Sequence, residues 1–339
     1  MRPTDFACHL TNYLSKYLPG QLGVSSNTVK SYRDAFSLFL RYCKAEKRLP
    51  PERLYLKDLT RDTVEGFLAW LETERNCSIS TRNQRLSAMH AFCKYLQYEC
   101  PEAMKQFQDV LSIPSKKKPT KAFDYLTLEG VQAILAQPDQ STRNGFRDLV
   151  LLALMYDSGA RVQEISDLTV SSLRLEEPAT IKLTGKGGKT RIVPLMSRTA
   201  DLLQKYLECF KCSNTPADAQ PLFYNRKREK LTRSGISFIL DKYAEMARGT
   251  LPNAIPTKVT PHTFRHSKAM HLLQSGVNLV YIRDVLGHSD IKTTEIYARA
   301  DTDMKRKALI NANHPEIQSK TPTWQKNSDL LEWLQTLGQ

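Results

Sequence analysis

The chain has 339 residues, with 49 Lys and Arg against 35 Asp and Glu, a net charge of +14. Its length exceeds one usual globular core and predicts two domains, and its longest apolar run, residues 149–156, is too short to cross a bilayer, which excludes a membrane-spanning protein. The basic excess predicts a polyanionic partner, most simply nucleic acid; a basic enzyme without such a partner is the alternative.

Seven cysteines, an odd number, lie mostly in helix-like segments, at positions 8, 43, 77, 93, 100, 209 and 212. They suit buried thiols in a reducing cytoplasm better than a disulfide framework. Cys209 and Cys212 form one C-x-x-C without a second pair or nearby His, so we interpret them as unlinked thiols. The N-terminus lacks the apolar core of a signal peptide. We therefore expect a soluble cytoplasmic protein.

The first 108 residues carry helical patterns. Apolar residues recur at helical spacing in three segments: 27–48 behind Asn27, 60–75 behind Thr60, and 80–99. The third segment has Arg82 and Arg85 three apart on one face of its early turns. In a basic helical domain, we consider two positions for these two arginines equally: on the solvated surface, or facing DNA.

Residues 109–122 are expected to form a basic linker. SIPSKKKPTKAF, residues 112–123, contains two prolines and four lysines and has no apolar period. Lys116, Lys117 and Lys118 in this linker are candidate DNA contacts.

Helical patterns resume after the linker, with a helix start near Thr127 and a strongly apolar helix that ends at Gly159. ATIKLTGKGGKTRIVPL, residues 179–195, is the one convincing β pattern, because two runs rich in Ile, Val, Leu and Thr flank a glycine turn. The fold class is therefore mainly α with a small β-hairpin or sheet. A basic loop before a helix capped by Thr232 adds further candidate DNA contacts, Arg226, Lys227, Arg228 and Arg233.

PHTFRHSKAMH, residues 261–271, raises the question of a metal site. His262 and His266 stand four apart on one helical face, which is a metal-ligand spacing. A zinc protease would have a glutamate where Thr263 stands, and Arg265 would face the cation. Thr260 caps this helix, so His262 and Arg265 lie near a helix N-terminus that favours anions. We expect an anion site, with His266 assigned to packing or support.

Other polar residues precede and follow this helix. GARVQEISDL places Arg161 and Glu164 on one helical face, and TGKGGKT carries Lys186 on a turn. His288 follows a helix that starts at Asn278 and ends at Gly287, and Tyr297 lies one helical stretch further on. The chain has no carboxylate constellation able to hold magnesium and no Walker-type phosphate loop, so we expect neither metal nor cofactor.

These motifs in this order resemble the tyrosine recombinase (phage integrase) family: GARVQEISDL, TGKGGKTRIVPL, HTFRH, LGHS and TTEIY. The resemblance covers residues 123–300 closely and the N-terminal half loosely. It implies a two-domain clamp around DNA, with a helical core-binding domain at 1–108, the linker at 109–122, a mixed α/β catalytic domain at 123–310 and a C-terminal tail at 311–339. It also implies double-stranded DNA sites as partner, a homotetramer on two duplexes, and accessory DNA-bending or directionality proteins.

The resemblance implies a role for each site residue. Tyr297 would attack a DNA phosphate to give a 3′-phosphotyrosyl link. Arg161 and Arg265 would clamp the non-bridging oxygens, Lys186 would protonate the leaving 5′-oxygen, and His262 and His288 would exchange protons or hydrogen bonds at the phosphate. Glu164 would orient its neighbours. Lys189 remains an alternative to Lys186 as the general acid.

Physical chemistry independently favours these roles. Guanidinium groups match the oxygens of a phosphodiester under attack, and the covalent link keeps the phosphoryl bond energy, so rejoining needs no ATP. A tyrosine with a pKa near 10 is a poor nucleophile at pH 7. We expect the surrounding cations to lower that pKa.

The functional prediction is a site-specific DNA recombinase for integration, excision or transposition of a mobile element. The alternatives are Xer-like dimer resolution, a type IB topoisomerase, and a non-catalytic DNA-binding protein of the same fold. The amphipathic segment SDLLEWLQTLG, residues 328–338, is expected to be a C-terminal helix that docks either on its own domain or on a neighbouring subunit.

Overall fold

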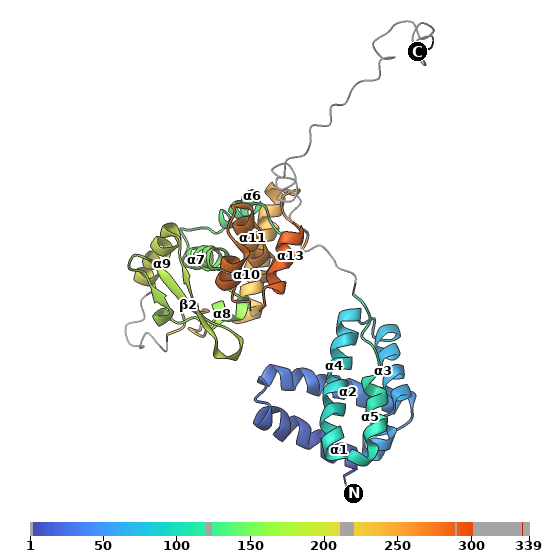
Figure 1. Cartoon of the computed structure of the whole chain (residues 1–339). Coiled ribbons are helices and arrows are strands. Elements are labelled where there is room, and N and C mark those ends of the chain that lie inside the picture. Colours follow the sequence, from blue (N-terminus) through green and yellow to red (C-terminus); the bar gives the residue numbers. More distant parts are fainter. Residues whose placement is uncertain (1–2, 119–123, 211–219, 289, 301–333, 335–339) are drawn as a thin grey trace. The chain divides into compact units, whose positions relative to one another are not determined.

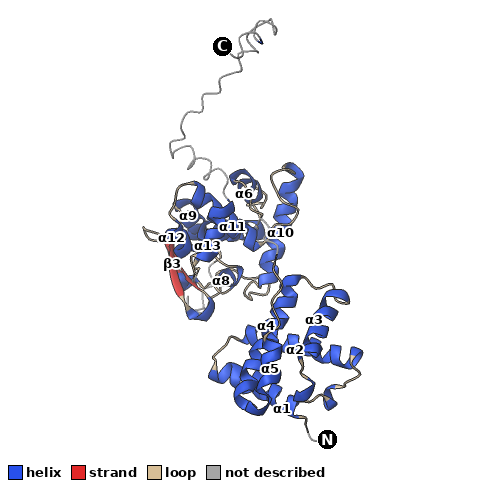
Figure 2. Cartoon of the chain, turned by 45° about the vertical axis from the view of Figure 1, so that its right-hand side comes forward, coloured by secondary structure: helices blue, strands red, loops and turns tan. Residues whose placement is uncertain are grey.

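A computed structural model of the chain describes residues 3–118, 124–210, 220–288, 290–300 and 334. The chain divides into two compact units, residues 1–121 and 122–339, which are described separately below. Helices dominate both units (Figures 1 and 2). Among the described residues, no helix has the length and apolar character needed to span a membrane. Apart from residue 334, the expected C-terminal helix at 328–338 lies outside the described residues.

The N-terminal unit is a set of helices around an aromatic core. Its longer helices are α1 (Asp5–Asn12), the π-helix η1 (Tyr13–Gln21), α2 (Ser26–Glu46), α3 (Arg61–Thr73), α4 (Ile79–Glu99) and α5 (Met104–Leu111), joined in part by the short 3₁₀ turns η2 (Pro51–Arg53), η3 (Leu56–Asp58) and η4 (Pro101–Ala103). Phe36, Phe39 and Phe92 are almost fully buried, with ring centroids of Phe36 and Phe92 5.1 Å apart. The helical stripes of α2 and α4 thus supply this core.

The helix starts of this unit confirm the predicted cap at Thr60 and show a further one at Ser25. The Thr60 side chain accepts a hydrogen bond from the Thr63 amide at the start of α3, as predicted. For α2 the cap is Ser25, whose side chain accepts from the Thr28 amide, so this helix begins just before the expected segment at Asn27. The helical part also extends beyond residue 108, because α5 continues to Leu111 and Ile113 packs in the same core.

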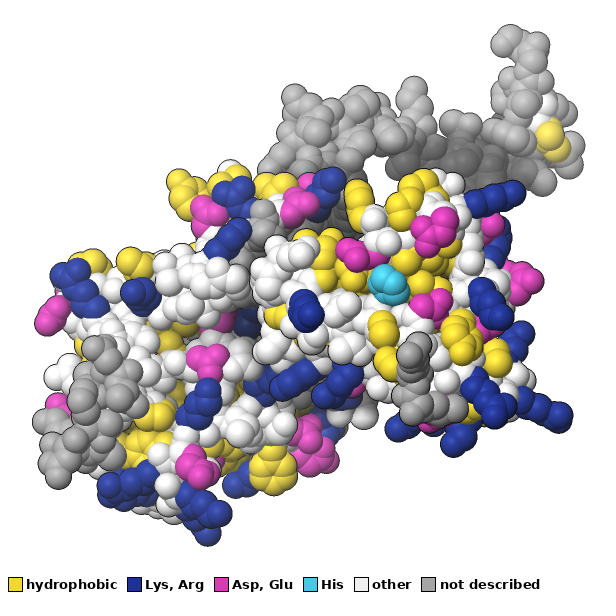
Figure 3. All heavy atoms as spheres, turned by 90° about the horizontal axis from the view of Figure 1, so that it is seen from below, with side chains coloured by type: hydrophobic (Ala, Val, Ile, Leu, Met, Phe, Trp, Pro, Cys, Tyr) yellow, Lys and Arg dark blue, Asp and Glu magenta, His cyan; other side chains and the backbone are white. Residues whose placement is uncertain are grey.

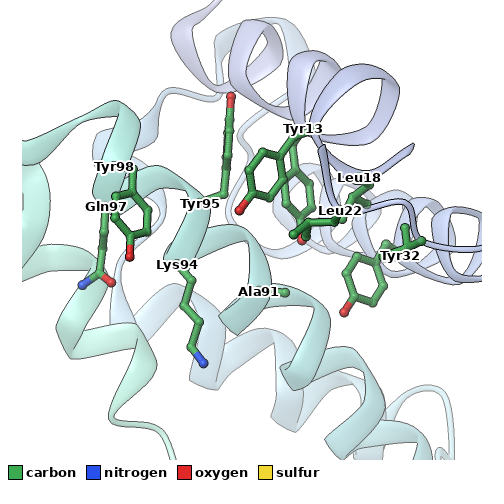
Figure 4. A pocket seen from close by; sticks show the side chains of 11 residues that line it. Tyr13, Leu18, Leu22, Tyr32, Ala91, Lys94, Tyr95, Gln97 and Tyr98 are labelled. Carbon is green, nitrogen blue, oxygen red and sulfur yellow. The ribbon is translucent and has the colours of Figure 1, made fainter. Parts of the chain in front are cut away.

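Tyrosines of η1, α2 and α4 line a cavity of about 480 Å³ in this unit. Figure 4 shows Tyr13, Tyr32, Tyr95 and Tyr98 around it, with Lys94 on the α4 side. Tyr13 is fully buried, and burial raises the pKa of its hydroxyl well above 10. The cavity is part of the N-terminal packing and lies in a different unit from the predicted catalytic residues.

The second unit packs helices around a buried central helix and one small sheet. Its helices are α6 (Leu128–Leu135), α7 (Arg143–Ser158), α8 (Val162–Ser166), α9 (Ser197–Cys209), α10 (Arg233–Thr250), α11 (Pro261–Gln274), α12 (Leu279–Leu286) and α13 (Lys292–Ala300). Leu149 to Met155 of α7 are all buried, which explains the continuous apolar run in the sequence. The helix ends at Gly159, whose φ of 55° lies in the left-handed region that glycine adopts readily.

The sheet contains the predicted hairpin and one strand more. Strands β2 (Thr180–Thr184) and β3 (Thr190–Pro194) pair antiparallel with Ile181 opposite Val193. The two-residue strand β1 (Leu173–Arg174), which follows the 3₁₀ turn η5 (Val170–Ser172), adds to the other edge of β2. The β2–β3 connection contains the 3₁₀ turn η6 (Lys186–Gly188). Ile181 and Val193 face the core, whereas Ile192 is exposed.

Three helices form a small separate core that holds Tyr297. Buried side chains of α11, α12 and α13 cluster there: Ala269, Met270, Leu273, Ile282, Leu286 and Tyr297. Tyr297 is only 1% exposed. The packing of α13 on α11 and α12 therefore fixes the position of this tyrosine.

Candidate active site

Three arginines hold the C-terminal end of α12. Their guanidinium groups donate to consecutive main-chain carbonyls: Arg191 Nε to Val285 O at 2.8 Å, Arg265 Nη2 to Leu286 O at 2.6 Å and Arg161 Nη2 to Gly287 O at 3.0 Å. Carbonyls at a helix C-terminus lack intrahelical partners and carry partial negative charge, so they attract cations. This end of α12 thus gathers three positive charges and places His288 directly beside them.

The buried carboxylate of Glu164 binds two of these arginines. It accepts two hydrogen bonds from Arg191, both at 2.8 Å, and one from Arg161 Nη1 at 3.0 Å, while its second oxygen also accepts the Arg161 main-chain amide at 2.7 Å. Burial would raise the pKa of Glu164, but the bonds from Arg191 and Arg161 outweigh it and hold the pKa below its usual value. Glu164 therefore stays ionised and orients both guanidinium groups.

Arg265 is buried within the cluster. It is 4% exposed, and its Nη1 donates to the Gly159 carbonyl at 2.7 Å in addition to the bond to α12. These two bonds use two of the five guanidinium N–H groups. Burial, followed by the charge of Arg161, lowers the pKa of Arg265 to about 10. Three guanidinium groups around one carboxylate leave a surplus of positive charge, which favours an anionic ligand.

The histidines surround Tyr297 from two sides. His266 Nδ1 lies 2.9 Å from the Tyr297 hydroxyl, and the ring of His288 stacks on Tyr297 with centroids 6.5 Å apart. His288 Nδ1 itself lies 2.9 Å from Thr294 Oγ1. His262 is exposed at the start of α11, with its ring centroid 6.3 Å from that of His266.

Burial and the neighbouring cations keep these histidines neutral. Burial first, then the nearby positive groups, lower the pKa of both His266 and His288 to about 4. His262 keeps part of its surface in solvent, and the partial burial of its ring, followed by the charges of Arg265 and Arg161, lowers its pKa. A bound anion would offset these cations and raise all three values.

The expectation for the Tyr297 pKa requires a correction. Arg265 and Arg161 do lower it, as expected, but burial raises it by more, so the net pKa lies above 10. The phenol is desolvated on all sides, and burial disfavours the charged phenolate. The arginines alone therefore do not activate this tyrosine in the protein without DNA.

The β2–β3 turn lies beside the arginine cluster. A Cβ on Gly185 would be 3.1 Å from Glu164 Oε1 and 3.8 Å from Arg161 Nη1, so the turn backbone is in close contact with both. Lys186 follows directly, but its side chain lies outside the described part of the structure. Lys189 is exposed on the same turn. The choice between these lysines stays a prediction.

The predicted DNA contacts differ in exposure. Arg82 is 6% exposed, and its Nη1 donates to the Pro114 carbonyl at 3.1 Å. It is therefore a buried residue that ties α4 to the following segment, so neither of the two expected positions, on the solvated surface or facing DNA, describes it in this structure. Arg85 is half-buried and donates to the Ser31 carbonyl. The remaining candidates are exposed: Lys116, Lys117, Lys118, Arg226, Lys227, Arg228 and Arg233. On the face drawn in Figure 3, Lys and Arg side chains lie over both units.

Two site residues were missed in the sequence. Arg191 lies on β3 next to exposed Ile192, and because side chains alternate along a strand, Arg191 faces inward. An inward-facing arginine on a short strand was a usable signal of a site residue in the sequence. His266 was assigned to packing or support, yet it contacts Tyr297. Within the described residues, no group of three His, Cys, Asp or Glu side chains could hold a metal ion.

Comparison with known proteins gives matches over both units of the chain. The Phage integrase family matches residues 124–304, and the Phage integrase, N-terminal SAM-like domain matches residues 11–100. The chain is 34% identical to "Putative integrase/recombinase y4rC" of Sinorhizobium fredii over 97% of both chains. It is 30% identical to tyrosine recombinase XerD of Listeria monocytogenes over 88% of this chain and 96% of the relative.

Solved structures share the fold. The Tn1549 transposon integrase in complex with circular intermediate DNA aligns with a TM-score of 0.67 at 16% identity, over 91% of this chain and 99% of that one. XerH site-specific recombinase bound to its difH substrate aligns with a TM-score of 0.62 at 23% identity, over 83% of this chain and 78% of that one. With the family matches and the sequence relatives, the conclusion is that the chain belongs to the phage integrase family of tyrosine recombinases.

Proposed function

We propose that this chain is a site-specific recombinase that cuts and rejoins double-stranded DNA through a 3′-phosphotyrosyl intermediate at Tyr297. The observation that carries the proposal is the convergence of Arg161, Arg265 and Tyr297 around α12, although they come from three separate segments. Guanidinium groups stabilise the charge that a phosphodiester gathers under attack. The DNA-bound relatives with this fold support double-stranded DNA as the partner.

The proposed roles follow from the contacts. Arg161 and Arg265 bind the non-bridging oxygens of the scissile phosphate, and Glu164 keeps Arg161 oriented for it. His262 and His288 supply hydrogen bonds or protons at the phosphate. Fixed guanidinium and imidazole groups replace metal ions in this proposal, and the tyrosyl ester stores the bond energy for rejoining without ATP.

Tyr297→Phe tests the proposal. The variant keeps the ring packing of Tyr297 but lacks the attacking oxygen, so we expect normal DNA binding and no covalent adduct. The measurement is denaturing capture of protein–DNA adducts from genomic DNA, followed by sequencing of the attached 3′ ends. Adducts at wild-type level in the Phe variant would refute Tyr297 as the nucleophile. Binding without adducts in the wild type would favour a non-catalytic DNA-binding protein.

A modified substrate separates Lys186 from Lys189 as the general acid. A 5′-bridging phosphorothiolate has a leaving sulfur that departs without protonation. The Ala variant of the general acid should cleave normal DNA slowly and the phosphorothiolate at the wild-type rate. The Ala variant of the other lysine should show no such rescue.

The biological role is proposed as integration, excision or transposition of a mobile element, by a homotetramer that exchanges strands of two duplexes. The relative named integrase/recombinase supports this role, and the relatives named XerD support chromosome dimer resolution as the second candidate. Sequencing of the captured adducts distinguishes the two. Sites at element ends support the first role, whereas a single chromosomal site outside any mobile element supports the second.

A further inference from the structure

The contact between His266 and Tyr297 joins two helices that are distant in sequence. His266 lies on α11 and Tyr297 on α13, and His266 Nδ1 is 2.9 Å from the Tyr297 hydroxyl oxygen. The ring centroids are 5.7 Å apart. Tyr297 is 1% exposed and packs in the core that α11, α12 and α13 share, so the contact is held by packing on both sides.

Tyr297 needs a proton acceptor in order to react. Its net pKa lies above 10, because burial outweighs the effect of Arg265 and Arg161. A phenol of this kind is almost entirely protonated at neutral pH, and its oxygen becomes a strong nucleophile only as the proton leaves. A group within hydrogen-bond distance of the hydroxyl is therefore required in the attacking geometry.

His266 has the geometry and protonation state of such an acceptor. With a pKa of about 4, its imidazole is neutral at pH 7 and carries one bare ring nitrogen. The other two histidines are placed differently. His288 Nδ1 lies against Thr294 Oγ1, and His262 is exposed at the start of α11.

We propose that His266 is a catalytic residue that accepts the Tyr297 hydroxyl proton on Nδ1 as the phenol oxygen attacks the scissile phosphorus. This inference rests on the proposed function. In the cleavage step the Tyr297 Oη–P bond forms, the P–O5′ bond breaks, the phenol proton moves to His266, and the leaving 5′-oxygen takes a proton from the general acid. In rejoining, the 5′-hydroxyl gives its proton back to the deprotonated general acid as its oxygen attacks phosphorus. The Tyr297 Oη–P bond then breaks, and His266 returns its proton to the departing Tyr297 oxygen.

The charges around His266 link this proton transfer to DNA binding. Protonated His266 would face positive or protonatable groups from its own helix, His262 and Arg265, and His288 from the segment after α12. These groups disfavour the imidazolium when the site is empty. A bound phosphodiester adds a negative charge and offsets them. Tyr297 therefore keeps its proton until DNA occupies the arginine cluster.

The test compares His266 with a matched histidine on the same helix. His271 is 8% exposed, and its Nδ1 lies 2.7 Å from the Tyr156 hydroxyl, so it repeats the same buried His–Tyr contact away from Tyr297. The full-length variants are His266→Ala, His266→Asn, His271→Ala and His271→Asn. Asparagine places its side-chain oxygen near the position of Nδ1 and accepts a hydrogen bond, but it does not take the proton.

The substrate is a nicked duplex that carries the sequence recovered by adduct capture with the wild-type protein. We expect His266→Ala to form the covalent adduct about 100-fold more slowly in a single turnover, with unchanged DNA affinity. His266→Asn should fall between Ala and wild type, because it restores alignment only. Both His271 variants should react at the wild-type rate per folded molecule. Rejoining of a preformed adduct should slow by the same factor as cleavage in His266→Ala.

Two further readouts separate proton transfer from a structural role. The wild-type rate should level off above the pKa of His266 in the DNA complex, whereas the rate of His266→Ala should keep rising with pH toward the pKa of Tyr297. Added imidazole should accelerate His266→Ala and leave the wild type unchanged. A wild-type adduct rate in His266→Ala, or equal slowing in the His266 and His271 variants without imidazole rescue, would overturn the inference while leaving Tyr297 as nucleophile. Adduct formation by Tyr297→Phe would overturn the proposed function, and this inference with it.

Discussion

Glu164→Gln should strongly destabilise the catalytic unit. The Glu164 side chain is 2% exposed and accepts bonds from Arg191 and from Arg161. Glutamine has nearly the same size as glutamate, but it removes the carboxylate, the only one among the described residues that contacts these guanidinium groups. Its –NH₂ group would also face the N–H donors of Arg161 and Arg191. Three arginines then remain together at the end of α12 without their counter-charge.

The magnitude follows from the burial of each partner. Removing one partner of a buried ion pair costs about 3–5 kcal/mol. The Arg191 side chain is 13% exposed and falls under this estimate, whereas that of Arg161 is 36% exposed and can be rehydrated. We therefore expect a loss of about 3 kcal/mol, at the lower end of that range. For a unit of this size the transition temperature should fall by roughly 6–12 °C.

Scanning calorimetry of the full-length chain measures this loss. The transition of the catalytic unit should move, and that of the N-terminal unit should not. Glu176→Gln is the matched control, since that side chain is 86% exposed and pairs only with exposed Arg174, so its effect should stay within about 0.5 kcal/mol. Adding Arg191→Met to Glu164→Gln should recover part of the loss by removing one unpaired cation. An unchanged transition in Glu164→Gln, or a further full loss in the double variant, would refute the argument.

Three further predictions concern the same unit. Gly287→Ala should lower the free energy of unfolding by about 1–3 kcal/mol, because Gly287 has a φ of 65° and a Cβ there would lie 2.8 Å from Arg191 Nη1. Urea unfolding of the full chain measures this loss, and an unchanged midpoint would contradict the prediction. The unfolding free energy should fall as the pH drops from about 6.5 toward 4, because His266 and His288 have pKa values of about 4 when folded, so the unfolded chain binds more protons in that window. Melting at pH 7 and pH 5 measures this, and bound DNA should shrink the difference. Ser267→Ala should lower the free energy of unfolding by about 1–3 kcal/mol, since the fully buried Ser267 hydroxyl accepts a hydrogen bond from the buried Leu126 amide. Ser267→Cys is the control, and equal stability of the Ala variant and the wild type would contradict the prediction.

Local patterns in the sequence predicted much of the secondary structure. Thr60, Thr127, Thr232 and Thr260 cap helices as expected, and Gly159 ends its helix, because a cap or a left-handed glycine depends on a few neighbouring residues. The hairpin followed from alternation of apolar residues around a glycine turn. The third strand was missed because two residues are too few to show a period.

The order of the motifs also indicated the family and several of the polar residues that the structure brings together, but not Arg191 or the contact of His266 with Tyr297. It did not indicate how the arginines are held. Arg191, Arg265 and Arg161 bind successive carbonyls of α12 from three different segments, and such long-range contacts leave no periodic trace in the chain. Burial decided the two remaining corrections, for Arg82 and for the pKa of Tyr297, since burial depends on packing by residues far away in sequence.

The sequence by itself thus determined which chemical groups the protein has and which local elements carry them. Only the tertiary structure decided which groups touch. His266 illustrates the difference, because its spacing from His262 is visible in the sequence, whereas its contact with Tyr297 spans 31 residues and depends on the packing of α13 against α11. Proton transfer acts over hydrogen-bond distance, so the three-dimensional packing of these helices sets whether the tyrosine can react.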